Sequence, residues 1–180
     1  MRIWFGLSLL VGSLLAPLVA SAQDTDSASV QVDATVVAAM SVTEMNSPID
    51  LGQLFQSSAD DVAADGSSSP FSTAARFDIT GASALSWRLT VVYADLTGPG
   101  AEVITITNPA ANDICFNTTQ GSQSPCTQTG DSPLTVTAGN HGGDGTAWVG
   151  FSFSVPANAT AGAYSNAAAV QLTADALLGT

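Results

Sequence analysis

Three carboxylates stand close together in the segment "DDVAADGSS", which contains Asp60, Asp61 and Asp65. Carboxylate oxygens are hard ligands of the kind that Ca²⁺ prefers, so these residues are the candidate metal ligands of the chain. The segment lacks the ligand spacing of an EF-hand loop and the bidentate glutamate that ends such a loop. We therefore predict a solvated acidic loop, no metal ligands and no cofactor, with calcium binding as the alternative.

The two cysteines, Cys115 and Cys126, enclose the polar segment "CFNTTQGSQSPC". Their spacing differs from the two-residue spacing of dithiol oxidoreductases, and two thiols with a distant His141 are too few ligands for a structural zinc ion. In an exported chain a single pair of cysteines is expected to oxidise. We predict a disulfide that ties the base of a surface loop.

No group of residues marks a catalytic site. A nucleophilic triad needs an imidazole beside a serine or cysteine, and the single histidine, His141, lies in the glycine-rich turn "AGNHGGDG". The chain has no nucleophile-elbow pattern, and no carboxylate pair is marked out for glycoside cleavage. We predict that the protein is not an enzyme and has no catalytic residues.

The charge balance is strongly acidic, with fifteen Asp and Glu residues, three Lys and Arg residues and a formal net charge of −12. Such a surface repels phosphate backbones, which argues against nucleic acid as a partner. The acids are scattered from Asp24 to Asp175. We interpret them mainly as groups that keep the protein soluble.

The first residues have the order of a secretory signal. Arg2 precedes an apolar run from Ile3 to Ala16, then Pro17, and small residues end the segment at Ala22. We predict cleavage after Ala22, which divides the chain into a signal peptide, 1–22, and a single secreted domain, 23–180. An uncleaved membrane anchor is the alternative. No later run is long enough to span a bilayer, so we expect a protein of the periplasm, the outer surface or the extracellular space.

Alternation of apolar and polar residues with a period of two is the main structural signal, and it predicts strands. The alternating runs are 29–36, 71–80, 85–93, 102–107, 134–137, 147–155 and 164–172. Trp87 shares a face with Leu85 and Leu89, which places it in a core. No amphipathic helix is evident after the signal. We predict an all-β fold, an immunoglobulin-like or jelly-roll antiparallel β-sandwich of about eight or nine strands.

The last two runs flank the turn material "ANATAG". Pro156 ends the first run because proline lacks an amide donor, and Gly162 supplies conformational freedom before the second. These features predict a β-hairpin with arms at 147–155 and 164–172.

Two stretches, "ATVVAAMSVTEMNSPIDLGQL" and "FSVPANATAGAYSNAAAVQLTAD", carry a family resemblance. The chain resembles a family of secreted bacterial domains of unknown function, similar in look to spore coat protein U and fimbrial subunits. Leu51-Gly52 stands at the family's Phe-Gly step, and Gly162 and Tyr164 at its "G-x-Y" step, with Asn166 where glycine is usual. The resemblance implies a pilin-like β-sandwich, exported from a Gram-negative cell and assembled into a surface structure, and it brings no catalytic residues.

The first alternating segment is a candidate interface. Val30, Val32, Ala34 and Val36 share one face, and this segment could complete the sheet of another copy or another envelope subunit. The alternative is an ordinary first strand of the same domain.

Trp148 is the second candidate interface residue, because alternation places it on the face opposite Phe151 and Phe153. There it could cover a sheet edge, meet a neighbouring subunit or touch a ligand. Together these features predict a non-enzymatic, secreted structural or adhesive protein of the bacterial cell envelope, including a fimbria- or pilus-like subunit. The alternative is a carbohydrate- or calcium-binding β-sandwich module with surface glycans as partners.

Overall fold

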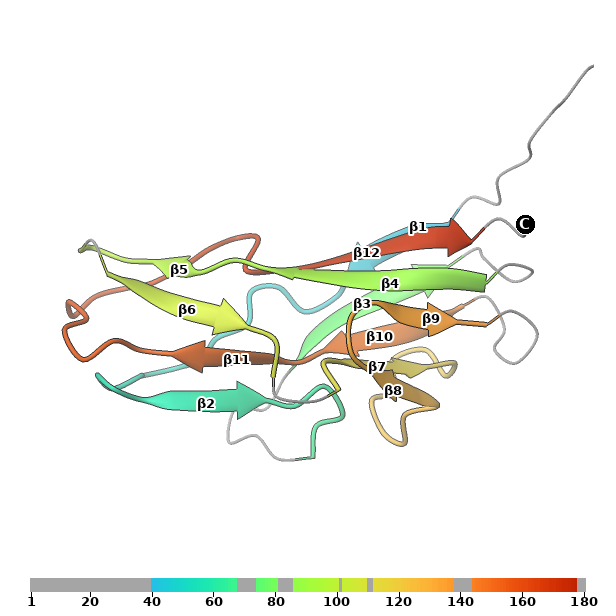
Figure 1. Ribbon diagram of the computed structural model, residues 1–180, viewed down its shortest axis with the longest axis horizontal. Helices are drawn as coiled ribbons and strands as arrows, with labels where there is room; N and C mark the ends of the chain where they lie inside the picture. Colours follow the sequence, from blue (N-terminus) through green and yellow to red (C-terminus); the bar gives the residue numbers. More distant parts are fainter. Residues whose placement is uncertain are drawn as a thin grey trace, which may run out of the picture. The chain divides into compact units, whose positions relative to one another are not determined.

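The computed structural model describes residues 40–67, 74–80, 86–100, 102–109, 112–137 and 144–177. These residues form twelve β-strands and no helix, and every strand pair is antiparallel (Figure 1). The prediction of an all-β fold is confirmed. The signal segment and the first alternating run, 29–36, lie outside the described residues, as does His141.

The strands form three sheets. The five-stranded sheet has the order β1 (Ser41–Glu44), β3 (Ala75–Thr80), β10 (Gly145–Val149), β7 (Ile114–Asn117), β8 (Gln128–Gly130). The three-stranded sheet has the order β12 (Val170–Leu177), β4 (Ser86–Tyr93), β9 (Leu134–Val136). The four-stranded sheet has the order β2 (Ala59–Val62), β11 (Phe151–Ser154), β6 (Val103–Thr107), β5 (Leu96–Thr97).

The five-stranded and three-stranded sheets pack against each other as a β-sandwich. Alternate residues of β4 and β9 supply one side of the shared core: Trp87, Leu89, Val91 and Val136. Alternate residues of β3, β7 and β10 supply the other side: Ala75, Phe77, Ile79, Ile114, Phe116, Ala147 and Val149. The rings of Trp87 and Phe116 meet edge to face across this core, with centroids 5.1 Å apart. The core position predicted for Trp87 is confirmed by its 1% exposure.

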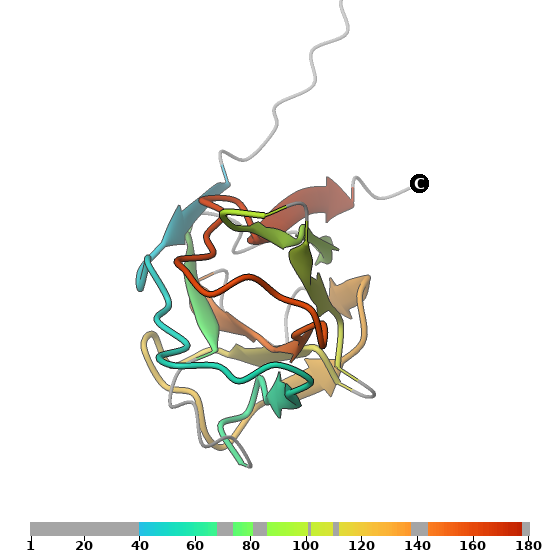
Figure 2. The same cartoon turned by 90° about the vertical axis from the view of Figure 1, so that its left-hand side faces the viewer.

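The four-stranded sheet has a different cover. The inner face of this sheet carries Ile104, Ile106, Phe151 and Phe153. Half-buried apolar side chains of the coils around residues 45–58 and 155–169 pack against the same cluster: Ile49, Leu51, Leu54 and Tyr164. Figure 2 looks onto these two coils, which cross in front of the strands in teal and in orange to red.

The strand count exceeds the predicted eight or nine because several strands are only two or three residues long and because one predicted strand is divided. The run 147–155 passes from the five-stranded to the four-stranded sheet at Gly150. A Cβ at Gly150 would lie 2.6 Å from the carbonyl oxygen of Val62. The missing side chain therefore lets β2 come close at the point where the chain changes sheets.

The predicted C-terminal hairpin is wrong, because its two arms belong to different sheets. β11 pairs with β2 and β6, whereas β12 pairs with β4 over its full length (Figure 1). Hairpin connections are usually about two to five residues long, and the segment between these strands is much longer. It crosses the end of the four-stranded sheet and pairs with β5 through Thr97 and Ser165 instead.

The predicted disulfide between Cys115 and Cys126 is confirmed, with Cα atoms 5.6 Å apart. The loop that it closes lies over the outer face of the five-stranded sheet. Gly121 N donates a hydrogen bond to Thr146 Oγ1 at 2.7 Å, and Thr146 Oγ1 donates to Asp78 Oδ1 at 2.7 Å. Because Thr146 and Asp78 are buried, the loop acts as a cover for polar side chains of the sheet.

Candidate binding groove

An open groove of about 1070 Å³ lies along the inner face of the four-stranded sheet. Its floor is apolar and comes from β5, β6, β11 and the residues that follow: Leu96, Ile104, Ile106, Phe151 and Val155. Its walls are the two coils, at residues 47–56 and 159–167. Gln56 Nε2 donates a hydrogen bond to the carbonyl oxygen of Ala159 at 2.8 Å and so links the walls.

The first wall begins where β1 ends its pairing with β3. Met45 N donates to the carbonyl oxygen of Arg76 at 2.9 Å. The amide side chain of Asn46 then replaces a strand partner: its Nδ2 donates to the carbonyl oxygen of Ala74 at 2.8 Å, and its Oδ1 accepts from Arg76 N at 2.7 Å. Beyond Asn46 the chain leaves the five-stranded sheet and crosses to the four-stranded one.

The second wall is held against the β5–β6 turn by close glycine contacts. The ring of Tyr164 lies where a Cβ on Gly98 would stand, and a Cβ on Gly162 would lie 2.6 Å from Pro99 Cγ. Thr97 and Ser165 exchange two backbone hydrogen bonds of 3.2 and 2.9 Å. Gly162 and Tyr164, singled out in the sequence by the "G-x-Y" step, therefore position this wall.

The main chain of the walls is largely unpaired. Among the described residues, the backbone of 48–54 and of 161–164 makes no hydrogen bond to another backbone group. Gly52 N donates only to the side chain of Asp50, at 2.8 Å. Because backbone groups are obligatory hydrogen-bonding groups, these stretches leave donors and acceptors for solvent or for a bound partner.

Large apolar side chains remain exposed near the groove. Phe55, on the first wall, is 76% exposed, and Met45, where that wall begins, is 47% exposed. The charged residues that line the groove, Glu44 and Asp50, are both acidic. An apolar floor between unpaired main-chain walls suits an extended, apolar polypeptide segment better than a small anionic ligand.

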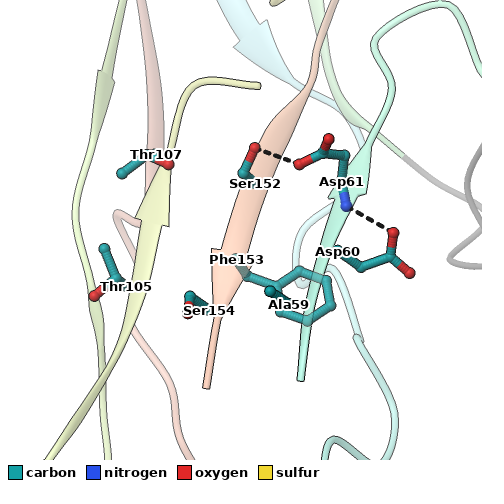
Figure 3. Close-up of a pocket in the computed structure, with 8 residues that line it drawn as sticks. All are labelled: Ala59, Asp60, Asp61, Thr105, Thr107, Ser152, Phe153 and Ser154. Carbon is teal, nitrogen blue, oxygen red and sulfur yellow. Dashed lines mark hydrogen bonds between the residues drawn. The ribbon is translucent and has the colours of Figure 1, made fainter. Parts of the chain in front are cut away.

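The outer face of the four-stranded sheet has a different character (Figure 3). It presents hydroxyl groups on neighbouring strands: Thr105, Thr107, Ser152 and Ser154. Asp61 borders this face on β2 and accepts a hydrogen bond of 2.5 Å from Ser152 Oγ. Asp60, at the preceding position of the strand, instead accepts a hydrogen bond from the backbone N–H of Asp61 at 2.8 Å (Figure 3).

The three acidic candidates do not converge. Asp60 and Asp61 belong to β2, so part of the predicted acidic loop is an edge strand. The buried side chain of Val62 anchors this strand beside β11. Asp65 lies in the turn beyond, where hydrogen bonds from Ser67 lower the pKa of its carboxyl group. Within the described ranges, no group of three or more His, Cys, Asp or Glu side chains could hold a metal ion.

Trp148 is covered by the chain itself. Its Nε1 donates to the carbonyl oxygen of Ser122 in the disulfide loop at 3.1 Å, and Arg76 lies 5.8 Å from the ring centroid. Only 9% of the residue is exposed, and it belongs to the same apolar cluster as Phe151 and Phe153. The strand changes sheets at Gly150, so alternation read across residues 147–155 does not predict that Trp148 joins the cluster of Phe151 and Phe153.

The other candidate interface residues, Val30, Val32 and Val36, lie outside the described residues. The groove leaves no regular signal in the sequence. The wall residues Ile49, Leu51 and Leu54 are spaced irregularly and carry no strand or helix period. Their one signal was the "I-D-L-G" step of the family resemblance.

No protein-family model, no curated protein and no solved structure matches this chain. In the part of the chain that the structure describes, there is no helix long and apolar enough to cross a membrane.

Proposed function

We propose that this protein is a non-enzymatic structural or adhesive subunit of the bacterial cell envelope, and that it assembles by strand addition. One observation carries the proposal. The groove combines an apolar floor with walls whose described main chain is unpaired along 48–54 and 161–164. An extended segment laid between such walls gains backbone hydrogen bonds, while every second side chain enters the apolar floor.

The chain contains a segment of this chemistry. Val30, Val32, Ala34 and Val36 stand at every second position, so in an extended conformation they share one face. These side chains are small enough to lie over a floor built of isoleucine and phenylalanine. In the proposed assembly, this segment of one copy occupies the groove of the next.

Two further features support placement in the envelope. The first 22 residues have the order of a secretory signal, with Arg2 before the apolar run and small residues up to Ala22. The disulfide between Cys115 and Cys126 is a bond that persists in oxidising compartments such as the periplasm. The strand-addition proposal does not depend on either.

The proposal is tested by adding one charge to the donor segment. Val32→Glu places a carboxylate on the apolar face, whereas Gln31→Glu adds the same charge to the neighbouring polar face. Sedimentation velocity over a range of concentrations should show multimers for the unchanged protein and for Gln31→Glu, and monomers for Val32→Glu. A labelled peptide of residues 28–38 should bind the Val32→Glu protein, whose own segment no longer competes.

Two results would reject strand addition through this segment. One is a strictly monomeric protein at high concentration that does not bind the peptide. The other is equal self-association of the Val32→Glu and Gln31→Glu variants.

The hydroxyl-bearing outer face of the four-stranded sheet favours a second candidate function, carbohydrate binding. Its four hydroxyls and the carboxylate of Asp61 can donate to and accept from sugar hydroxyl groups (Figure 3). Calorimetric titration with neutral polysaccharides tests this function. Asp61→Asn should weaken any binding, whereas Asp60→Asn, which leaves the hydrogen bond to Ser152 intact, should not; absence of heat with all polysaccharides would exclude it for those sugars.

A further inference from the structure

A buried carboxyl group lies where the chain passes from one sheet to another. Asp113 directly precedes β7 and is 1% exposed. Its carbonyl oxygen accepts a hydrogen bond of 2.8 Å from the N–H of Gly150, the residue between β10 and β11. Among the described residues, its carboxyl oxygen Oδ1 has no hydrogen-bond partner, and Oδ2 lies 3.4 Å from the hydroxyl of Tyr93.

The hydrogen atoms at this junction can be counted. The Tyr93 hydroxyl has a single proton, and the carbonyl oxygen of Gly150, at 2.7 Å, is a closer acceptor than the carboxyl group of Asp113. The shorter contact takes the larger share of this proton, so an ionised Asp113 accepts only a long hydrogen bond of 3.4 Å from Tyr93. A protonated Asp113 instead donates to the phenol oxygen, and an unbroken chain runs from Asp113 through Tyr93 to Gly150.

The surroundings also disfavour charge on Asp113. Burial, together with the nearby carboxylate of Asp131, raises the pKa of Asp113, although hydrogen bonds from backbone N–H groups, including that of Ser132, and from the Tyr93 hydroxyl act in the opposite direction. Burial and the neighbouring Asp113 raise the pKa of Tyr93, so its phenol stays protonated. The titratable groups that act on Asp113 within the described structure are thus Tyr93, from β4, and Asp131, from the β8–β9 connection.

We propose that Asp113, Tyr93 and Gly150 form an acid-operated latch at the junction of the five-stranded and four-stranded sheets. The hydrogen-bond chain of the latch is complete when Asp113 carries a proton, and it is weakened when Asp113 ionises. Gly150 directly precedes Phe151, which forms part of the groove floor, so the latch fixes the sheet at one end of the groove. The inference does not depend on what the groove binds.

The direction of the pH effect follows from linkage. A carboxyl group whose pKa is raised on folding binds its proton more tightly in the native state than in the unfolded state. Its contribution to stability is complete below the ordinary aspartate pKa of about 3.9 and is lost as the pH rises through the higher native value. The latch therefore contributes most at low pH, and its contribution is lost as the pH rises through the raised native pKa of Asp113.

The latch is tested by measuring Tm between pH about 4 and about 8. Asp113→Asn should raise Tm by a few degrees near neutral pH and flatten its dependence on pH. Tyr93→Phe should lower Tm most at the acidic end, where the complete chain is lost. Asp60→Asn, which removes an exposed carboxylate, should leave the difference between acidic and neutral conditions unchanged.

A direct titration keeps the inference testable if a variant does not fold. The ¹³C resonance of the Asp113 carboxyl carbon in the unchanged protein should titrate well above the ordinary aspartate value of about 3.9. Titration at or below that value would overturn the latch. An unchanged pH profile of Tm in a folded Asp113→Asn variant would do the same.

Discussion

The two halves of this molecule use the same alternation of apolar and polar residues but cover their apolar faces differently. In the sandwich half, the five-stranded sheet faces the three-stranded sheet, and Leu89 and Ile79 between them are fully buried. In the groove half, the four-stranded sheet faces two coils, and Leu96 remains half-buried. A sheet face is closed when a second sheet lies against it. Where only coils cross it, an open groove remains, although the side chains of Ile104 and Phe151 are buried.

The outer faces differ as well. The five-stranded sheet has its outer face covered by the disulfide loop, which buries Thr146 and Asp78. The outer face of the four-stranded sheet has no such cover among the described residues, and its serine and threonine hydroxyls line an open recess (Figure 3). The five-stranded sheet is therefore covered on its inner face and, where the disulfide loop lies, on its outer face, whereas the outer face of the four-stranded sheet is open.

The largest expected effect contrasts one leucine from each half. Leu89→Ala should lower the free energy of unfolding by about 3–5 kcal/mol, because it leaves a cavity in a closed core. Leu96→Ala should cost only about 1–2 kcal/mol, because its side chain already contacts water in the groove. Denaturant titrations of the two variants measure both values. Equal costs would mean that the two halves are equally closed.

The disulfide should have the next largest effect. Replacing both Cys115 and Cys126 by serine should lower the free energy of unfolding by about 3 kcal/mol, because the unfolded chain loses a constraint. Loosening of the loop should also expose Trp148 and shift its fluorescence to longer wavelength. Ser122→Ala serves as the control, because Trp148 bonds to the backbone oxygen of Ser122 and not to its side chain. Unchanged fluorescence in the cysteine variant would show that the loop covers the sheet without the disulfide.

The smallest effect on stability is expected at Phe55. Phe55→Ser should change the free energy of unfolding by less than about 0.5 kcal/mol, because the ring is 76% exposed. It should nevertheless reduce binding of an apolar fluorescent dye, because Phe55 lines the groove. Val92→Ser is the matched control: Val92 is 53% exposed but lies on β4, away from the groove lining. Equal loss of dye binding in both variants would argue against the groove as the dye site.

Much of the sandwich half was predictable from the sequence. Trp87, Leu89 and Val91 alternate with polar residues along β4, and the structure buries all three. The pairing of Cys115 with Cys126 was predictable because the protein has only two cysteines. These features depend on neighbouring residues along the chain, and a strand's side-chain period is a local property.

The candidate site was much less predictable. The arms of the predicted hairpin belong to separate sheets, and β2 forms within a stretch that reads as an acidic loop. Asp113 and Tyr93 carry no sequence signal, because their proximity depends on β10 and β11 meeting at Gly150. Strand partners are chosen by contacts between distant segments, which the period of a single segment does not encode.

The sequence by itself determined that the chain forms strands, which side chains of most strands face inward, and which cysteines pair, because these depend on short-range periodicity and composition. Only the tertiary structure decided which strands pair, that Trp148 is covered by the disulfide loop, and that one sheet is faced by coils. These outcomes depend on how whole elements share a limited apolar surface, so they arise only when all the elements pack together.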